Sequence, residues 1–598
     1  MPAAICDHAL LSDCQSAALV TRDGAIDWWP APRFDSASAF SALLDDDAGH
    51  WTIAPDEPFA SSWRYVPGTL VVETTMRTGS GTLRLTDALA LGIGTREHEI
   101  GHAVPHALVR HAEVLDGELT VRMTCAPKLE YGLAVASFVR EGGGVATLGG
   151  SERLFLRGDR PLELDAATAS ARVRLCAGEH AAWTLHRVAG TYAAAPDRLD
   201  ARETIADTLA AWRSWSAQHA GYDGLHRDRV QLASRVLQGL TYQPTGALVA
   251  AATTSLPERP GGEDNWDYRF AWLRDAAMSV RALSTSACAD ESRRYFDWIV
   301  RVAVTCRAED QMQIVFGVDG ERDLSEHRLE HLAGHLGSRP VRVGNAAWRQ
   351  NQLDVLGHVL DAAWAIRDEL ELDAFTAHFL RQLADRAARQ WREPDSGIWE
   401  GREGDRHYVV SKVGCWIALD RAVRFGERLA GADDRRRWAA QRDELRRVVL
   451  RDGFDERRGA FTGALGSDRL DAGVLLLGLC GFVSPDDPRM TSTIALLEAE
   501  LGDDGLLRRW TGAQDGAFVP VSFWLAECHA RAGRVARAHE VFERAASAAT
   551  DLGLLAEEVD LATGDPLGNI PQAISHVGLV NAAQALTHAE APARGPVT

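Results

Sequence analysis

The stretch LVVETTMRTGSGTLRLTDAL, residues 70–89, decides the fold class of the N-terminal part of this chain. It holds two segments rich in Val, Thr and Leu, one on each side of the glycine-containing turn at residues 79–81. Segments rich in β-branched residues around such a turn are typical of a β-hairpin. We therefore expect antiparallel strands in this region.

The same pattern continues on the C-terminal side of this hairpin. The segments LTVRM (residues 119–123) and ARVRLC (residues 171–176) alternate apolar and polar side chains, as a strand with one buried face does. Glycine-rich turns at residues 141–144 and 149–150 separate such segments. Many short strands joined by turns favour a sandwich over a sheet of βαβ units. We expect residues 1–200 to form an antiparallel β-sandwich domain.

From about residue 201 the spacing of apolar residues changes to that of helices. Segments with apolar residues three and four positions apart include 232–240, 353–364, 413–417 and 521–528. Roughly thirty residues per helix and loop gives on the order of a dozen helices, which a ring of paired helices can hold. The expected divisions are a linker helix over residues 201–225, a helical domain over residues 226–590 and a disordered tail over residues 591–598.

Composition and charge exclude several classes of partner. The 598 residues exceed the size of a single hydrophobic core, so at least two domains are expected. A net charge of -20 argues against binding to nucleic acid or to anionic membranes. The sequence has neither a long apolar run nor a signal-peptide pattern, so we expect a cytoplasmic protein. Nine cysteines without a CxxC pair predict reduced thiols, with no metal site and no cofactor.

The segment GGEDNWDYRFAWLRDAA, residues 261–277, concentrates aromatic, acidic and arginine residues. Sugar rings present apolar faces to Trp and Tyr and hydroxyl groups to charged partners. The candidate sugar-binding residues of this segment are Trp266, Tyr268, Trp272, Arg274 and Asp275. The alternative is the start of a helix with buried aromatic side chains.

Two acidic segments in the helical part could supply a catalytic pair. Glu400 follows Trp399 in a glycine-containing loop, and the adjacent Glu557 and Glu558 precede a turn rich in Gly and Pro. A carboxyl group beside an indole ring in a partly dry loop suits a general acid, whereas a hydrated carboxylate suits a base. Glycoside hydrolysis uses this division of labour. The alternative is that these are surface acids.

Other motifs give weaker signals. The sequence has no GxSxG, P-loop, HExxH or dinucleotide-binding motif. His327, His331 and His335 recur every four residues, which we interpret as one face of a solvated helix and not as a metal site. Arg339 lies in a loop where it could bind sugar hydroxyls, or form a structural ion pair. Lys412 is one of only two lysines in the sequence, since nearly all other basic residues are arginine, and it is a further candidate ligand. The alternative is that a lysine stands at this position by chance.

Together these segments resemble glycoside hydrolase family 15, the glucoamylase, glucodextranase and trehalase family, and especially its bacterial trehalase-like branch. The likeness begins with DCQSAALVTRDGAIDWWPAPRFDSASAF, residues 13–40, and spans nearly the whole chain. The other segments that carry it are NWDYRFAWLRDA, FGVDGERDL, GSRPVRVGNAA, SGIWEGREGDRHYVVSKVGCWIALDRAV and LLAEEVDLATGDPLGNIPQAISHVGLVNAA.

The resemblance implies a fold and a pair of catalytic residues. The fold is an N-terminal antiparallel β-sandwich domain followed by an (α/α)6 barrel that carries the catalytic site. The reaction is hydrolysis with inversion at the anomeric carbon. Glu400 matches the general acid of the family, and Glu557 matches its general base. Glu558, the next residue, is the alternative base.

The resemblance also assigns the sugar-binding residues. Arg274 and Asp275 match the pair that holds the hydroxyl groups of the terminal glucose. Tyr268 matches the aromatic hydroxyl beside the reacting carbon, and Trp399 matches the cavity wall next to the acid. Gly337 stands near the arginine loop, where fungal glucoamylases carry a tryptophan, which disfavours a starch polymer.

The expected function is an inverting, exo-acting α-glucoside hydrolase that releases β-glucose from a small α-glucoside, with trehalose as the expected substrate. One alternative is a glucoamylase-like or isomaltose-type oligosaccharide glucohydrolase. Another is a carbohydrate-binding protein without catalytic activity, and a third is a phosphorolytic enzyme. The sequence leaves open whether the chain forms a homo-oligomer.

Overall fold

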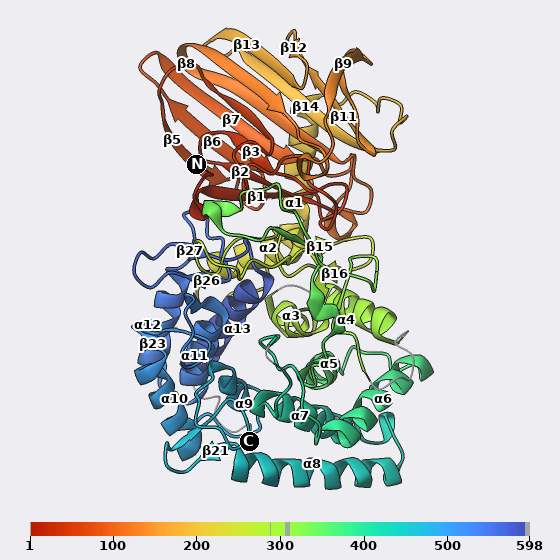
Figure 1. Cartoon of the computed structure of the whole chain (residues 1–598), viewed down its shortest axis with the longest axis vertical. Coiled ribbons are helices and arrows are strands. Elements are labelled where there is room, and N and C mark those ends of the chain that lie inside the picture. The colour runs from red at the N-terminus through yellow and green to blue at the C-terminus, as the bar shows by residue number, and fades with distance from the viewer. Residues whose placement is uncertain (1, 287–288, 305–310, 403, 592–598) are drawn as a thin grey trace.

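The protein consists of a β domain and a helical domain, which follow each other along the chain (Figure 1). The computed structural model describes residues 2–286, 289–304, 311–402 and 404–591. The sequence-predicted fold class, an antiparallel β domain before an (α/α)6 barrel, is confirmed. The domain divisions at residues 200 and 225 stay a prediction, and all but the first residue of the predicted tail lies outside the described residues.

The strands of the β domain pair in antiparallel order throughout. They are β1 (His8–Ser12), β2 (Ala17–Thr21), β3 (Ala25–Trp28), β4 (His50–Pro55), β5 (Ala60–Tyr65), β6 (Val72–Arg77), β7 (Gly81–Leu89), β8 (Ala107–Ala126), β9 (Ser137–Glu141), β10 (Gly144–Leu148), β11 (Glu152–Gly158), β12 (Glu163–Asp165), β13 (Thr168–Cys176) and β14 (His180–Ala189).

The long strand β8 belongs to both layers of the sandwich. Its first part, residues 107–117, pairs with β7 and β14, and its second part, residues 118–126, pairs with β4 and β13. Leu119, Val121 and Met123 are fully buried, as their alternation predicts. Their side chains stabilise the sandwich by removing apolar surface from water.

In the described part of the chain, the helical domain contains twelve α-helices, together with short helices and hairpins. A further helix, α1 (Ala201–Gln218), precedes them. The twelve are α2 (Arg227–Gly239), α3 (Leu273–Ser286), α4 (Ala289–Val304), α5 (Asp354–Ala365), α6 (Ala374–Gln390), α7 (Val409–Phe425), α8 (Ala432–Asp452), α9 (Leu476–Leu479), α10 (Pro488–Glu500), α11 (Val519–Arg531), α12 (Val535–Ala546) and α13 (Ala573–Glu590).

Short strands and 3-10 helices fill the connections. The strands are β15 (Thr241–Tyr242), β16 (Ala247–Leu248), β17 (Ala271–Trp272), β18 (Val315–Phe316), β19 (His327–Arg328), β20 (Arg342–Val343), β21 (Phe454–Asp455), β22 (Ala460–Phe461), β23 (Gly502–Asp503), β24 (Leu506–Leu507), β25 (Ala517–Phe518), β26 (Glu558–Val559) and β27 (Pro566–Leu567). The 3-10 helices are η1 (Ile5–Asp7), η2 (Glu97–Glu99), η3 (Glu130–Gly132), η4 (His335–Gly337), η5 (Ala346–Arg349), η6 (Gly426–Arg428) and η7 (Ala472–Leu475).

The α-helices form an inner and an outer ring. The inner helices α3, α5, α7, α9, α11 and α13 each contact the next, and α13 packs on α3 to close the ring (Figure 1). The inner helices α7 and α11 are buried along nearly their whole length. The outer helix α8 buries a narrow stripe that includes Trp438 and Leu445, as an amphipathic helix does.

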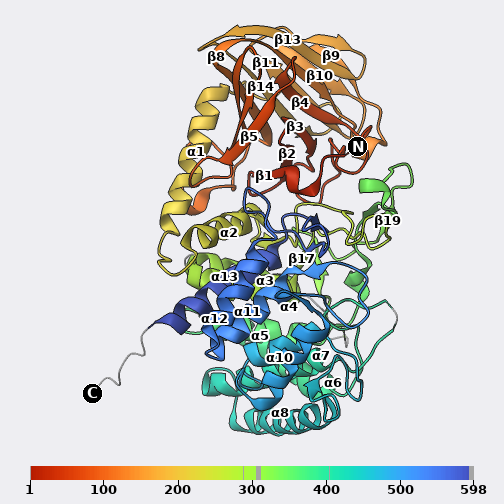
Figure 2. The ribbon, with the colours of Figure 1, turned by 90° about the vertical axis from the view of Figure 1, so that its left-hand side faces the viewer.

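Helix α1 runs along the side of the β domain, where it contacts β7, β8 and β14 (Figure 2).

The seven cysteines in the described part of the chain are free thiols. No described helix combines the length and the apolar character that a membrane crossing requires.

The helix expected around the three regularly spaced histidines is not present, and this prediction was wrong. His327 lies in β19, while His331 and His335 bond to the backbone oxygens of Tyr131 and Leu43 in the β domain. Gly334 has φ of +78°, and a Cβ there would meet the backbone oxygen of Ser338 at 1.8 Å. The chain therefore turns at this glycine, and the histidines fasten the loop to the β domain.

Candidate active site

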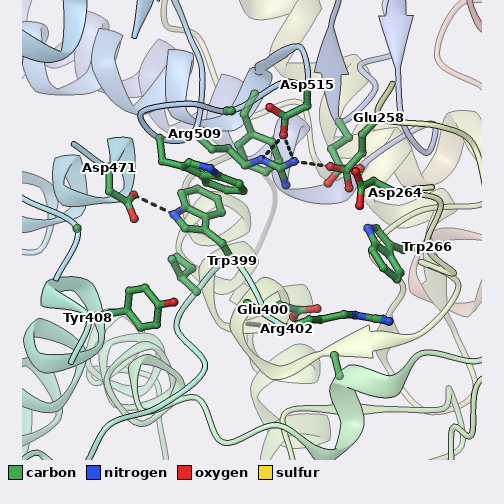
Figure 3. A pocket seen from close by; sticks show the side chains of 18 of the residues that line it. Glu258, Asp264, Trp266, Trp399, Glu400, Arg402, Tyr408, Asp471, Arg509 and Asp515 are labelled. Carbon is green, nitrogen blue, oxygen red and sulfur yellow. Dashed lines mark hydrogen bonds and ion pairs between the residues drawn. The ribbon is translucent and has the colours of Figure 1, made fainter. Parts of the chain in front are cut away.

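A cavity of about 630 Å³ lies at the N-terminal ends of the inner helices (Figure 3). Each connection that precedes an inner helix contributes to its lining. Examples are Trp272 before α3, Gln350 before α5, Glu400 before α7, Asp471 before α9, Phe518 before α11 and Glu557 before α13. Because helix N-termini carry a partial positive charge, this end of the ring favours carboxylate groups.

The carboxyl group of Glu400 is held through one of its two oxygens. Trp272 Nε1 donates to Glu400 Oε1 at 2.7 Å, and Arg274 and Gln352 donate to the same oxygen at 3.3 Å each. The amide of Gln350 holds the backbone oxygen of Glu400 at 3.0 Å. The three side-chain donors to the carboxyl group all bind Oε1. The other carboxyl oxygen, Oε2, accepts from none of these described residues and is therefore the one that can carry a proton.

The loop that presents Glu400 is tight. Glu400 has φ of +58°, a left-handed conformation that is unfavourable for a residue with a Cβ. Three residues earlier, Gly397 also has positive φ, and a Cβ there would lie 2.6 Å from the ring of Tyr408. Between them, Trp399 donates from Nε1 to Asp471 Oδ1 at 2.9 Å. Burial raises the pKa of Asp471 to about 6.

Glu557 is the second carboxyl group that faces the cavity. It is 2% exposed, and the hydroxyl of Tyr268 donates to its Oε1 at 2.8 Å. Burial raises the pKa of Glu557 well above its usual range, and the negative charge of Glu258 adds to this effect. The Arg509 guanidinium and the Tyr268 hydroxyl oppose it.

Two aromatic rings connect the carboxyl groups. Tyr268, which bonds Glu557, packs edge-to-face on Trp272, which bonds Glu400, with 5.6 Å between ring centroids. Each ring thus holds one carboxyl group by a hydrogen bond and fixes the position of the other ring by contact.

Glu558 points away from the cavity lining. Its Oε2 accepts from the backbone N–H of Gly516 at 2.9 Å, and its Oε1 lies 2.9 Å from Arg509 Nη2. The guanidinium of Arg509 also pairs with Glu258 and Asp515 (Figure 3). This guanidinium supplies positive charge among three carboxylates, so we do not assign a metal ion to them.

Arg274 and Asp275 lie in the first turn of α3 and line the cavity. Arg274 Nη1 donates to Gln352 at 2.7 Å and lies 3.5 Å from Asp354. Burial raises the pKa of Asp275 to about 6, although the Arg274 guanidinium lowers it. This pair offers both hydrogen-bond donors and acceptors to a polar ligand.

Trp266 lines the cavity, but its indole ring is already in contact with arginine. The guanidinium groups of Arg342 and Arg402 lie 4.2 Å and 3.9 Å from its ring centroid. Glu326 pairs with both arginines, at 3.0 Å and 3.1 Å. Trp266 stays a predicted sugar-binding residue, and Arg402 couples its ring to the Glu400 loop.

Arg339 and Lys412, two further predicted ligands, do not line the cavity. Arg339 donates to the backbone oxygens of Glu330 and Leu332, and Lys412 to that of Glu393. Both side chains therefore hold the local fold. We do not include them, or Glu558, among the proposed sugar ligands.

The segment around Tyr268 also contacts the β domain. Asp267 and Arg269 form a fully buried ion pair at 2.7 Å. Arg269 donates to the backbone oxygen of Ser36 at 2.7 Å, and its guanidinium lies 5.7 Å from the Tyr131 ring centroid. Alternate residues of this segment thus serve the cavity and the domain junction.

Sequence reasoning missed several residues of the cavity. They include Glu258, Tyr408, Asp471, Arg509, Asp515 and Phe518. The segment LLRRWTGAQDGAF, residues 506–518, carries the same mixture of arginine, aromatic and acidic residues as residues 261–277. The composition of this segment is the sequence feature from which Arg509 and Asp515 could have been predicted as cavity residues.

Comparisons with known proteins give consistent findings. A sequence profile described as Glycosyl hydrolases family 15 matches residues 224–584, and one described as Trehalase-like, N-terminal matches residues 2–202. The chain is 36% identical to a trehalase of Mycolicibacterium smegmatis, over 98% of this chain and 92% of the relative. It is also 36% identical to a trehalase of Mycobacterium tuberculosis, over 98% and 90%, and 30% identical to one of Thermoplasma volcanium, over 97% and 93%.

Among solved structures, a bacterial glucoamylase complexed with acarbose superposes with a TM-score of 0.75. The match covers 98% of this chain and 95% of that chain, at 13% sequence identity. At this identity the likeness concerns the fold alone.

Proposed function

The chain belongs to glycoside hydrolase family 15, and from this premise we propose that it hydrolyses trehalose with inversion, using Glu400 as the general acid and Glu557 as the general base. The chain is thus a glycoside hydrolase. Its preference for trehalose and the roles of the two residues are our proposal.

In the proposed reaction, Glu400 donates a proton to the oxygen that joins the two glucose units. The bond between this oxygen and one anomeric carbon breaks as positive charge develops on that carbon. Glu557 takes a proton from a water molecule, whose oxygen forms a new bond to the opposite face of the same carbon. One unit leaves as β-glucose and the other as α-glucose. Solvent then returns a proton to Glu400 and removes one from Glu557.

The observation that carries the proposal is the pairing of each carboxyl group with its own aromatic ring. Trp272 and Tyr268 hold Glu400 and Glu557 in one cavity, and the two rings are in contact. Separate attachment suits an inverting pair, which requires about 6.5–9.5 Å between carboxyl groups to admit a water molecule. The buried Glu557, with its raised pKa, is a stronger base than an ordinary carboxylate.

Glu557 is a better candidate for the base than Glu558. The Glu557 side chain lines the cavity, whereas the Glu558 side chain is engaged by Arg509 and Gly516. A base must lie within hydrogen-bond reach of the water that it activates. This requirement supports Glu557.

Trehalose is favoured by the relatives and is compatible with the size of the cavity. The trehalases named above match nearly the whole chain. A cavity of about 630 Å³ lies within the range of about 300–1,000 Å³ that small-ligand sites occupy. Arg274 and Asp275 supply the polar groups that orient a glucose unit.

The test is glucose release from trehalose, maltose, isomaltose, maltotriose and soluble starch, with the anomer of the first product read by NMR. Each substrate is tested with and without phosphate. We expect β-glucose from trehalose and much slower release from the others. Preferential cleavage of another linkage would refute the substrate, and α-glucose as the sole initial product would refute inversion. Glucose 1-phosphate would indicate phosphorolysis.

A further inference from the structure

The guanidinium of Arg274 contacts both the proposed general acid and a carboxylate outside the cavity lining. Its Nη2 donates to Glu400 Oε1 at 3.3 Å, and its Nη1 lies 3.5 Å from Asp354 Oδ2. Asp354 is the first residue of α5, is fully buried and does not line the cavity. The two terminal nitrogens of one cation therefore face two different carboxyl groups.

The backbone fixes the position of Asp354. A Cβ on Gly414 of α7 would overlap the Cα of Asp354, so α5 and α7 are in direct backbone contact here. The carboxylate itself has few partners. Its Oδ1 has none among the described residues, and its Oδ2 lies 3.5 Å from Arg274 and 3.7 Å from His358 Nε2. At these distances the carboxylate acts mainly through its charge.

The other groups that interact with Asp354 do not neutralise it. Burial lowers the pKa of His358, so its imidazole is neutral near neutral pH. Burial raises the pKa of Cys415, on α7, to about 12 and that of Asp395, between α6 and α7, to about 6. Neither group supplies positive charge. Among the residues that the structure describes, Arg274 is the cation paired with Asp354.

Three carboxyl groups surround the guanidinium of Arg274. Burial lowers its pKa, whereas the charges of Asp354, Asp275 and Glu400 raise it, with Asp354 first among them. Asp275 and Tyr268 are the other titratable groups that interact with Glu400. Burial raises the pKa of Tyr268 well above its usual range, so its hydroxyl is uncharged. Arg274 is therefore the cation whose charge acts on Glu400.

We propose that Asp354 is a positioning residue for the reaction, because it balances the charge of Arg274 and thereby helps Glu400 to keep its proton. An opposite charge close to a carboxyl group favours the ionised form of that group, which cannot act as an acid. Asp354 offsets this effect, while Arg274 stays in place to orient Glu400 and a glucose hydroxyl group. This role rests on the proposed function of Glu400 as the general acid.

The test is the pH dependence of kcat/KM for Asp354→Asn and the wild type, on the substrate of the glucose-release panel that the wild type cleaves fastest. The basic limb reports the loss of the proton from the general acid. Without its counter-charge, Arg274 stabilises ionised Glu400 more strongly, so the limb should move about one unit to lower pH. We expect kcat/KM to fall about tenfold above the limb and to stay within about threefold on the plateau. A purely structural role would lower kcat/KM at every pH and leave the limb in place.

The matched control is Asp361→Asn on the same helix. The Asp361 carboxylate pairs with Arg421 at 2.7 Å and does not line the cavity, so the basic limb of this variant should coincide with that of the wild type. An unmoved limb in folded Asp354→Asn would overturn the role of Asp354. If Asp354→Asn does not fold, His358→Lys decides the question. Its ammonium group would draw Asp354 away from Arg274 and move the limb in the same direction, and an unmoved limb there would also overturn the role.

Failure of this role can be told apart from failure of the proposed function. Normal turnover by Glu400→Gln would remove the general-acid assignment and the role of Asp354 with it. If Glu400→Gln is inactive and the limb of folded Asp354→Asn coincides with that of the wild type, the role of Asp354 alone is wrong.

Discussion

The substitution Tyr268→Phe tests the link between the cavity wall and the proposed base. It removes the hydroxyl group that donates to Glu557 Oε1 at 2.8 Å and leaves the ring in place. This hydrogen bond favours the ionised form of Glu557, so its loss raises the pKa of a carboxyl group that burial has already raised.

The size of the effect follows from the strength of the bond. A hydrogen bond to a charged group contributes about 1.5–3 kcal/mol, which corresponds to a rise in the Glu557 pKa of about one to two units. A base acts only when it is ionised. At pH values below the acidic limb of the wild-type profile, we therefore expect kcat/KM to fall by about ten- to 100-fold. Well above the limb, most of the loss should be recovered.

The assay is the pH dependence of kcat/KM for trehalose, with the rate measured as glucose release. The acidic limb of Tyr268→Phe should lie about one to two units above that of the wild type. The control is Tyr222→Phe, because Tyr222 bonds the backbone oxygen of Leu225 and Thr587, outside the cavity. An acidic limb that coincides in Tyr268→Phe and the wild type would refute the assignment of Glu557 as the base that Tyr268 supports.

Three further predictions follow from the site and the domain junction. Glu400→Gln should lower kcat on trehalose by about 10²–10⁴-fold with little change in KM, and normal turnover would contradict its role as the acid. Glu557→Gln should cause a similar loss, whereas Glu558→Gln should lose less than about tenfold; the reverse order in kcat would assign the base to Glu558. Arg269→Met should lower the free energy of unfolding by about 3–5 kcal/mol, because Asp267 remains buried without its partner. Denaturant unfolding measures this change, and Asp267→Asn added to Arg269→Met should recover part of the loss.

Periodicity in the sequence predicts most of the fold. The alternation of Leu119, Val121 and Met123 gives a strand with one buried face, and the helical spacing after residue 201 gives the rings of helices. The same reasoning failed for His327 to His335, where a helical spacing is interrupted by Gly334. A spacing pattern counts which residues recur, but it does not register a backbone turn between them.

The cavity is predictable where its residues share a short segment. Tyr268, Trp272 and Arg274 all come from one such segment, and all line the cavity. Arg509 lies far along the chain and reaches the site only because the ring of helices closes. The choice between the adjacent Glu557 and Glu558 depends on which way each side chain points, and composition carries no information on this.

The alternation at residues 266–269 has a consequence for engineering. Tyr268 serves the cavity, while Arg269, the next residue, is anchored by Ser36 and Tyr131 of the β domain. A chimaera that carries the β domain of a relative would replace the β-domain residues that Arg269 contacts, next to Tyr268 of the cavity. The two domains are therefore not independent modules, and residues 266–269 should be transplanted together with the β domain that they fit.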